Sequence, residues 1–349
     1  MNFGVSVALA SAILFGMSTP FAKVLVGSVS PLFLAGLLYA GSGLGLLVVL
    51  MVRFLHAPAE RRLVMPERAE WPWLMAAIFF GGVAGPVALM YGLVTTAATT
   101  ASLLLNLEGV LTALLAWFVF RENFDRRILI GMLAIIAGGL VLAWNPAANA
   151  QSSSGMLLVV VACLCWAIDN NFTRKVSASD ATMIACLKGL VAGTVNVGLA
   201  LLTGQALPSA NAIGLALVLG FLGYGVSLVL FVLALRHLGT ARASAYFCVA
   251  PFVGAVLAVI LTNDAVSWQL GAAGLLMAAG VWLHLTERHG HRHAHEPLEH
   301  GHAHAHDEHH QHTHDFEWDS QEPHAHRHIH APISHTHAHY PDLHHRHPH

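Results

Sequence analysis

Charged side chains are scarce in this sequence. Asp, Glu, Lys and Arg make up only 10% of its 349 residues, whereas hydrophobic residues make up 56%. Soluble domains carry roughly 25% charged residues, because their surfaces must be hydrated. We therefore expect neither a soluble enzyme nor a nucleic-acid-binding protein, and the net charge of −2 gives no sign of a nucleic-acid partner. The composition predicts an integral membrane protein whose main solvent is the lipid bilayer.

Cysteine is also scarce, and so is positive charge near the start. The four cysteines lie inside apolar runs, where thiols behave as small hydrophobic groups, and they are Cys163, Cys165, Cys186 and Cys248. They imply no disulfide framework. The first apolar run, MNFGVSVALASAILFGMS, lacks the preceding basic region of a cleaved signal peptide. We therefore expect this run to be the first membrane span.

Ten apolar runs are long enough to cross about 30 Å of hydrocarbon. A polar linker, Asn145 to Ser154, divides them into five and five. The sequence therefore predicts an all-α membrane protein with ten transmembrane helices. The runs fall at residues 3–23, 31–52, 73–93, 99–120, 128–144, 155–171, 181–202, 212–235, 241–261 and 268–285.

The chain repeats one of its spans. TTASLLLNLEGVLTALLAWFVFRE at 99–122 returns as ARASAYFCVAPFVGAVLAVILTND at 241–264, which is 142 residues further along. Glu122 thereby stands opposite Asp264, and a repeated span predicts duplicated halves. The arginine-rich loop RENFDRR follows the first copy, but TNDAVSWQ, which has no arginine, follows the second. Equivalent loops are thus expected on opposite sides of the membrane, so the halves are inverted.

Lysine and arginine predict the orientation of the spans. Fifteen of the 17 fall in alternate loops and in the tail, and hence on one side. Cytoplasmic loops are enriched in these residues, so we expect both termini in the cytoplasm of a bacterial cell and the spans in its inner membrane. Of the exceptions, Lys188 lies within a span, and Lys23 ends a span, where its ammonium can snorkel to the interface.

Four segments follow from these patterns. We expect a first five-helix repeat at 1–144, a linker at 145–154, a second five-helix repeat at 155–286, and a histidine-rich cytoplasmic tail at 287–349.

Three stretches carry a family resemblance. They are FGMSTPFAK at 15–23, ASLLLNLEGVLTALLAWFVFRE with IGMLAIIAGGLVL after it, and ALRHLGTARASAYFCVAPFVGAVLAV in the second half. Through them, residues 3 to about 285 resemble the EamA-type transporters of the drug/metabolite transporter superfamily. The resemblance implies ten helices in two inverted repeats that carry small organic solutes, often outward. Gly109 stands where such proteins commonly have the proline that Pro251 supplies here, so we expect the first copy of the repeated span to be less kinked.

Three ionisable residues lie well inside spans: Glu108, Asp169 and Lys188. Each costs about 2.5 to 3.5 kcal/mol to insert near a helix centre, so each is expected to face a partner or a cavity. Asp169 and Lys188 lie at matching depths on consecutive helices, which predicts an ion pair. Such a pair is either a tether between two helices or a coupling group that breaks during transport.

Further polar residues are predicted to line a solute pathway with Glu108, and they are Ser102, Asn106, Asn170, Asn171 and Asn196. Asparagine inside a span is also a common link between helices, so the structural interpretation stays open for the amides. Pro20 and Pro251 are predicted to bend their helices and to free backbone carbonyls for a solute.

The tail concentrates 23 of the 26 histidines between His289 and His349. Many alternate with other residues, which on an extended chain places imidazoles on one side. Such ligands suit nickel, zinc, cobalt or copper. We expect the tail to be disordered without metal, because its composition cannot bury a core. The predicted ligands are His291, His293, His295, His302, His304, His306, His324, His326, His328, His330, His335, His337, His339, His345, His347 and His349.

The patterns together predict a secondary transporter that moves a small solute by alternating access, in the efflux direction, with protons as a possible coupling ion. It requires no cofactor, and transition metal binds only the tail. One alternative is that a transition metal is itself transported and the tail collects it. A metal sensor that transports nothing is a further alternative, but it gives Glu108 and Asp169 no purpose. The oligomeric state stays open.

Overall fold

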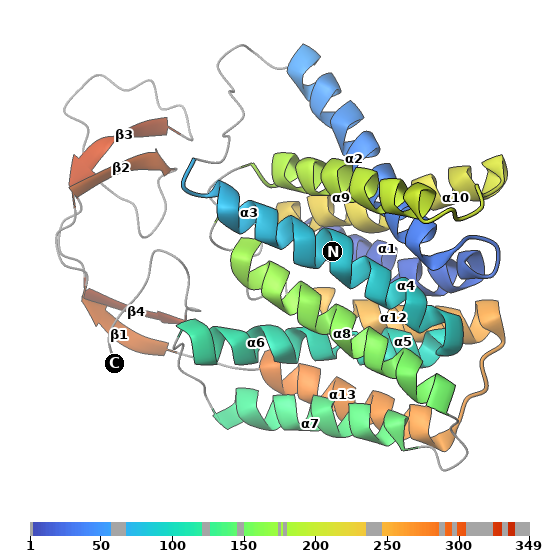
Figure 1. Cartoon of the computed structure of the whole chain (residues 1–349). Coiled ribbons are helices and arrows are strands. Elements are labelled where there is room, and N and C mark those ends of the chain that lie inside the picture. The colour runs from blue at the N-terminus through green and yellow to red at the C-terminus, as the bar shows by residue number, and fades with distance from the viewer. Residues whose placement is uncertain are drawn as a thin grey trace. The chain divides into compact units, whose positions relative to one another are not determined.

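The structure is a computed structural model of the chain. It describes residues 3–56, 68–120, 126–144, 150–173, 176, 180–234 and 246–285, together with four short stretches of the tail at 290–294, 299–304, 324–329 and 334–338. The chain forms two compact units, Met1–Glu287 and Arg288–His349. The first unit is a bundle of long apolar helices (Figure 1).

Ten apolar helices run through the described part of the first unit. Seven are long and apolar enough to cross a membrane, and three are shorter, at Leu129–Ala143, Ala250–Thr262 and Trp268–Leu283. This confirms the predicted fold class of ten membrane helices. The labelled elements are α1 (Phe3–Val26), α2 (Pro31–His56), α3 (Trp71–Ala77), η1 (Ile78–Ala84), α4 (Gly85–Thr95), α5 (Ala98–Leu104), α6 (Leu107–Phe120), α7 (Arg126–Ala143), α8 (Ala150–Thr173), α9 (Ala181–Leu202), α10 (Ala210–Gly220), η3 (Phe221–Val226), α12 (Ala250–Thr262) and α13 (Trp268–Leu285).

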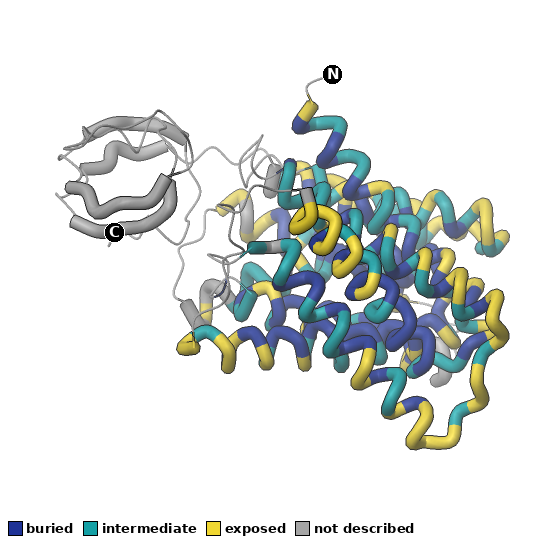
Figure 2. The backbone as a smooth tube through the Cα atoms, turned by 90° about the horizontal axis from the view of Figure 1, so that it is seen from above, coloured by how far each residue is buried: buried dark blue, intermediate teal, exposed yellow. Residues whose placement is uncertain are grey.

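The surface of the bundle is apolar in the way that lipid requires. Large side chains of α2 are open to the surroundings, among them Val48 at 59% exposure and Phe54 at 79%. Exposed indoles lie at helix ends, as at Trp144 and Trp268, where tryptophan prefers the membrane interface. Figure 2 shows exposed residues along the outside of the helices and buried residues within the bundle.

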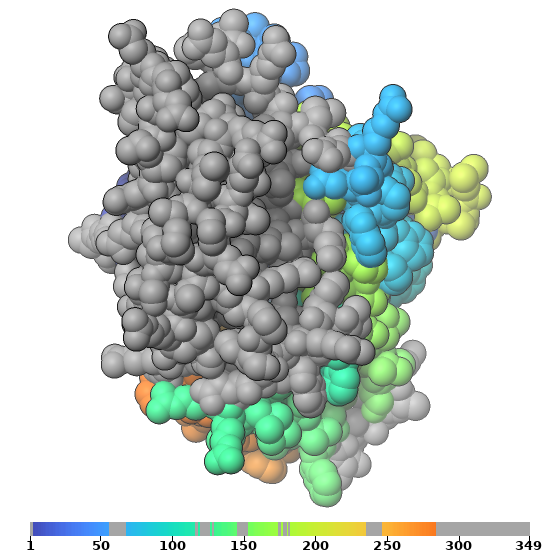
Figure 3. Space-filling view, turned by 90° about the vertical axis from the view of Figure 1, so that its left-hand side faces the viewer, coloured from blue at the N-terminus to red at the C-terminus, as the bar shows by residue number. Residues whose placement is uncertain are grey.

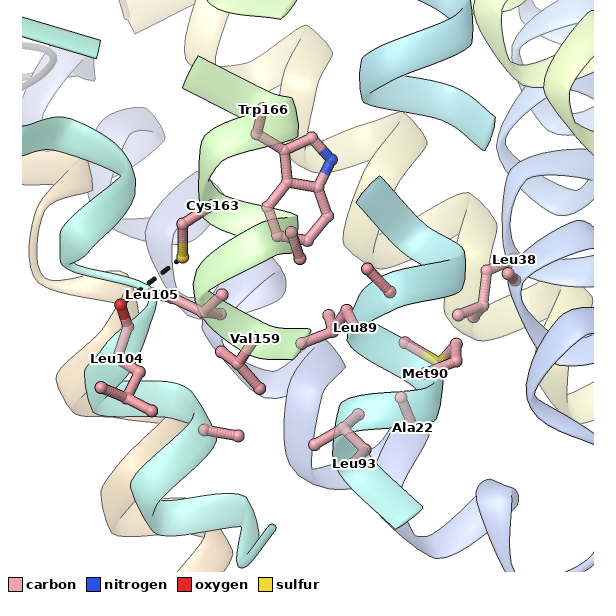
Figure 4. Packing of buried hydrophobic residues seen from close by; sticks show 14 of the residues in the cluster. Ala22, Leu38, Leu89, Met90, Leu93, Leu104, Leu105, Val159, Cys163 and Trp166 are labelled. Carbon is pink, nitrogen blue, oxygen red and sulfur yellow. Dashed lines mark hydrogen bonds between the residues drawn. The ribbon is translucent and has the colours of Figure 1, made fainter. Parts of the chain in front are cut away.

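The interior is built from small and aliphatic side chains. Figure 4 shows Val159, Cys163 and Trp166 of α8 packed beside Leu89 of α4 and Leu104 of α5. The Cys163 thiol donates to the carbonyl of Leu104 across an Sγ–O distance of 3.5 Å. All four cysteines are free thiols, and three of them are buried.

Several helix pairs join the repeats, among them α2 with α9 and α7 with α13. Helices α7 and α13 lie side by side in Figures 1 and 3. Where α2 crosses α9, the backbones nearly touch, since a Cβ added to Gly189 would lie 2.5 Å from the amide nitrogen of Gly43. Only glycine allows so close an approach.

The repeated span is broken in both copies. The first copy turns at Leu105–Asn106, between α5 and α6, and the second turns at Cys248–Val249, just before α12. The first copy is therefore broken although it lacks the proline, and which copy is more strongly kinked stays a prediction. Asn106 explains the break without a proline, because its side-chain amide donates to the carbonyl of Leu103 at 3.0 Å and its backbone N–H bonds the same carbonyl at 3.1 Å.

The third span of each half contains a π-helical segment. These are η1 in the first half and η3 in the second. Shifting residues 79–84 by the repeat distance of 142 gives 221–226, so the segments occupy equivalent positions. A π-helical turn displaces backbone carbonyls from their usual partners, and it is frequently found at functional sites.

The linker is shorter than expected. Helix α8 begins at Ala150, inside the predicted linker 145–154, and residues 145–149 lie outside the described residues. Ser153 and Ser154 fall near the N-terminus of α8, where serine is tolerated better than in a helix interior.

Four short strands lie in the second unit: β1 (Gly290–Ala294), β2 (Glu299–His304), β3 (His324–Ile329) and β4 (Ser334–Ala338). β1 pairs with β4 and β2 pairs with β3, both antiparallel. These stretches differ from the predicted disorder. Their alternation of histidine with small or apolar residues has the period of two that a strand also has.

Candidate functional site

The predicted ion pair is present between α8 and α9. The Lys188 Nζ lies 2.6 Å from both carboxylate oxygens of Asp169. Thr173, one turn after Asp169, donates its hydroxyl to Asp169 Oδ1 at 2.8 Å and accepts from Lys188 at 3.4 Å. The side chains of Lys188 and Asp169 are only 15% and 9% exposed. The two charges thus compensate one another where neither is well hydrated.

Glu108 is bound by a different face of α8, the helix that also carries Asp169. It lies in the first turn of α6, where the helix dipole favours a carboxylate. The amide of Asn170 on α8 donates to Glu108 Oε1 at 2.9 Å and to Thr112 Oγ1 at 3.4 Å. Asn170 is exposed in the bundle and Glu108 is partly buried.

Consecutive residues on α8 therefore serve the two acids. Asp169 turns to α9 and Asn170 turns to α6, as expected for neighbours about 100° apart around a helix. The network joins three spans and contains two carboxylates and one ammonium group. Such a set can bind a cation, a proton or the charged ends of a solute.

The π-helical segment η1 packs directly against Asp169 of the ion pair. Its Gly81 carbonyl accepts from the Tyr39 hydroxyl at 2.6 Å and from Trp166 Nε1 at 3.0 Å. A Cβ on Gly81 would lie 1.8 Å from Asp169 Oδ2, so only glycine fits there. Sequence reasoning missed these residues, although the glycine pair at 81–82 in an apolar span is a signal of close packing.

The remaining predicted polar residues lie elsewhere. Asn196 donates to the Gly82 carbonyl at 3.1 Å, and Asn171 donates to the carbonyls of Ala167 at 2.8 Å and Thr112 at 3.3 Å. These amides link helices. Asn106 bonds its own turn, and its amide lies 3.9 Å from the Met277 sulfur. Neither it nor Ser102 has a hydrogen bond to Glu108.

Ser102 of α5 lies where this helix packs against α1 and α12, the helices that carry Pro20 and Pro251. A Cβ on Gly254 would lie 2.8 Å from Ser102 Oγ and 2.7 Å from the Gly16 carbonyl. Pro20 has no N–H to give that carbonyl, and α1 continues unbroken through it. Pro251 stands in the first turn of α12, so it begins the half-helix and does not bend a continuous one.

Lys23 binds the end of a neighbouring helix, and snorkelling of its ammonium to the membrane interface stays a prediction. Its Nζ donates to the carbonyls of Leu93 at 2.5 Å, Val94 at 3.3 Å and Thr96 at 3.0 Å, at the end of α4. The ammonium thereby satisfies carbonyls that the end of a helix leaves without intrahelical partners.

The predicted metal ligands carry no described side chains. His291, His293, His302, His304, His324, His326, His328, His335 and His337 lie in the four strands, whereas His295, His306, His330, His339, His345, His347 and His349 lie outside the described residues. In the residues that were described in full, no group of three or more His, Cys, Asp or Glu is placed to hold a metal. Metal binding by the tail stays a prediction.

Comparison with known proteins agrees with this architecture. The model of the EamA-like transporter family matches residues 2–144 and again residues 153–286. The chain belongs to the EamA-like transporter family. This EamA-like protein is therefore an integral membrane transporter of small solutes, and the lipid bilayer is its environment.

Two curated relatives cover most of this EamA-like chain. An uncharacterized transporter of Methanothermobacter thermautotrophicus is 26% identical over 291 residues, which is 79% of this chain and 84% of the relative. A probable amino-acid metabolite efflux pump of Salmonella typhimurium is 26% identical over 303 residues, which is 80% of this chain and 93% of the relative.

A solved structure has the same fold. Its TM-score to this chain is 0.58 with 18% sequence identity, and the match covers 80% of this chain and 95% of the solved one.

Proposed function

We propose that this protein exports a small amino-acid-like metabolite by alternating access of its two inverted repeats. The observation that carries the proposal is the intramembrane network of Glu108, Asp169 and Lys188, because charges at this depth are retained for solutes and ions. The relative named as a probable amino-acid metabolite efflux pump supports the class of solute and the direction. The inverted repeats support the rocking mechanism.

The network offers complementary groups for a zwitterion. A solute carboxylate competes with Asp169 for Lys188, and a solute ammonium binds a carboxylate released in this way. A proton on Asp169 removes the negative charge and so weakens its attraction to Lys188. Proton entry and solute release are thereby linked, and protons moving inward drive the solute outward.

We also propose an orientation of the protein in the membrane, based on the charges of its loops. Both termini and the loops rich in lysine and arginine lie in the cytoplasm, and the spans lie in a bacterial inner membrane.

Flux measurements in proteoliposomes test the function. Vesicles loaded with a mixture of labelled amino acids are given a pH gradient, and loss of each label is compared with vesicles held without the gradient. We expect faster loss of a subset of labels under the gradient. Thr203→Ala is a matched control, because the Thr203 hydroxyl bonds only the end of its own helix. Equal loss from protein-containing and empty vesicles for every label would contradict the proposal.

We further propose that the tail is a cytoplasmic site for nickel, zinc, cobalt or copper. The strand registers support it, since His291 stands opposite His337, His293 opposite His335, and His302 opposite His326. Residues directly opposite one another have Cβ atoms about 4.5–5.5 Å apart, which suits two imidazoles on one metal. No described group in the spans supports a metal as the transported solute.

A further inference from the structure

One end of the bundle holds charged contacts that the solute network does not use. We define the distal end as the end at which α1 finishes at Val26 and α2 begins at Pro31. Because ten apolar helices run through the described part of the bundle, α1 begins and α13 finishes at the opposite end. At the distal end, the connection from α4 to α5 is contacted by Lys23 of the first repeat and Asp264 of the second.

Lys23 closes the α4 side of this connection. Its ammonium bonds three carbonyls of the last turn, including that of Thr96, where α4 ends. A cation at a helix C-terminus is stabilised both by the carbonyls and by the helix dipole.

Asp264 closes the α5 side. Its Oδ2 accepts from the Thr99 backbone N–H at 2.9 Å and from the Thr99 hydroxyl at 3.0 Å. A carboxylate at a helix N-terminus satisfies an otherwise unpaired N–H. Thr96 and Thr99 are only 3% and 2% exposed, so the connection is buried.

We infer that Lys23, Thr96, Thr99 and Asp264 form a distal latch, which holds the distal end closed and must release before that end opens. The contact between Thr99 and Asp264 crosses from one repeat to the other, and rocking of one repeat against the other separates such contacts. This inference rests on the proposed alternating access. The counterpart of Asp264 in the first repeat, Glu122, lies outside the described residues.

Thiol accessibility tests the latch in the full-length protein. Ser102 is 1% exposed and faces α12 in the distal half of its span, so Ser102→Cys is a closed-state reporter. The protein is placed in lipid nanodiscs, where a charged maleimide reaches both faces, and the unaltered chain gives the blank for native cysteines. Adding Asp264→Asn should raise the labelling rate about tenfold, because it removes the charge from the contact between the repeats. Lys23→Met should change the rate in the same direction, because it frees the end of α4 next to that contact.

Two controls separate release of the latch from general loosening. Lys23→Arg keeps the cation and should label slowly, and so should Ser28→Ala, whose hydroxyl bonds only its own turn at the same end. Ser11→Cys reports on the opposite half, where Ser11 is fully buried against Ser227. In the latch variants its labelling should be unchanged or slower.

The latch is refuted if Ser102→Cys labels at the parental rate in both charge variants, or if both reporters speed up together. Flux by the unaltered protein is measured in parallel. A transporting protein with an unchanged reporter rejects the latch alone, whereas an accessible reporter in a protein without flux rejects the proposed function alone.

Discussion

Asp169 is held by three hydrogen bonds and by a close contact with the backbone of the third span. Two bonds from Lys188 and one from Thr173 satisfy its carboxylate, and Gly81 leaves no space between it and the third span. Breaking a compensated buried pair on one side leaves an unpaired charge in low dielectric, whereas removing both charges does not. The difference between these two cases separates a structural role from a role in transport.

The first prediction uses that difference. Asp169→Asn and Lys188→Met should each lower the free energy of unfolding by about 3 kcal/mol, and the double variant should recover to within about 1 kcal/mol of the parent. The recovered double variant should nevertheless carry no solute, because it has no group left to exchange. Thermal stability and proteoliposome flux are measured on each purified variant. A double variant that transports at the parental rate would leave the pair as a tether.

The second prediction concerns Glu108. Glu108→Gln keeps an oxygen acceptor for Asn170 and has nearly the same volume, so unfolding should change by less than about 1 kcal/mol. Flux should fall at least tenfold if the charge binds the solute or a proton. Thr112→Val, which removes only the weaker partner of Asn170, is the matched control and should keep most of the flux. Parental flux in Glu108→Gln would remove this acid from the pathway.

Sequence reasoning reached the acids, the lysine and Asn170, but not Gly81 and the residues that bind its carbonyl. A charged residue in an apolar span is conspicuous in the sequence, because burying it in lipid costs free energy. Asp169 and Lys188 could be paired because they lie at similar depths on consecutive spans. Gly81, Tyr39 and Trp166 are ordinary residues of a packed span. Their role depends on a carbonyl displaced by the π-helical turn, which no local residue pattern specifies.

Sequence reasoning likewise predicted some features of the helices and missed others. The presence of the spans could be predicted from hydropathy, because a helix that crosses the lipid must be long and apolar. The break in the first copy did not, because Gly109 suggested a straighter helix while the Asn106 side chain in fact competes with the backbone for the Leu103 carbonyl. Helix ends were also missed where polar residues such as Gln151 begin α8.

The third prediction compares two glycines of α9. Gly189→Ala should lower the free energy of unfolding by about 1–3 kcal/mol, because its Cβ would overlap Gly43 of α2. Gly198→Ala meets nothing within 4 Å and should raise it by about 0.5–1 kcal/mol through helix propensity. Thermal unfolding of both in the same detergent checks the sign. Equal effects would mean that the crossing of α2 and α9 is not tightly packed.

The fourth prediction is the topology of the entire chain. A reporter enzyme that is active only outside the cytoplasm should be silent when fused after Glu287 and active when fused within 145–149, before α8 begins. The reason is the excess of lysine and arginine on one side. A reporter active only in the cytoplasm is the control and should give the reverse pattern. Activity of the first reporter at the C-terminus would overturn the orientation.

The fifth prediction concerns the tail. The full-length protein should bind several nickel or zinc ions at pH 7 by calorimetry, and a chain ending at Glu287 should bind none with comparable affinity. Imidazoles with a pKa of about 6.5 are mostly neutral at pH 7, and protons compete for the same nitrogens below about pH 6. Affinity should therefore fall as pH falls. Undiminished binding at pH 5.5 would point to the acidic side chains as ligands.

The matched positions of η1 and η3 bear on the ancestry of the molecule. An irregular turn at the same place in both halves was inherited from one parental segment, which existed before the gene doubled. The surroundings of the two turns differ, because Gly81 of the first repeat packs against Asp169 of the second, whereas the equivalent Gly223 of the second repeat packs against the neutral Ser18 of the first. A duplicated frame thus kept its π-helical turns in common, while the side chain packed against each turn came to differ in charge.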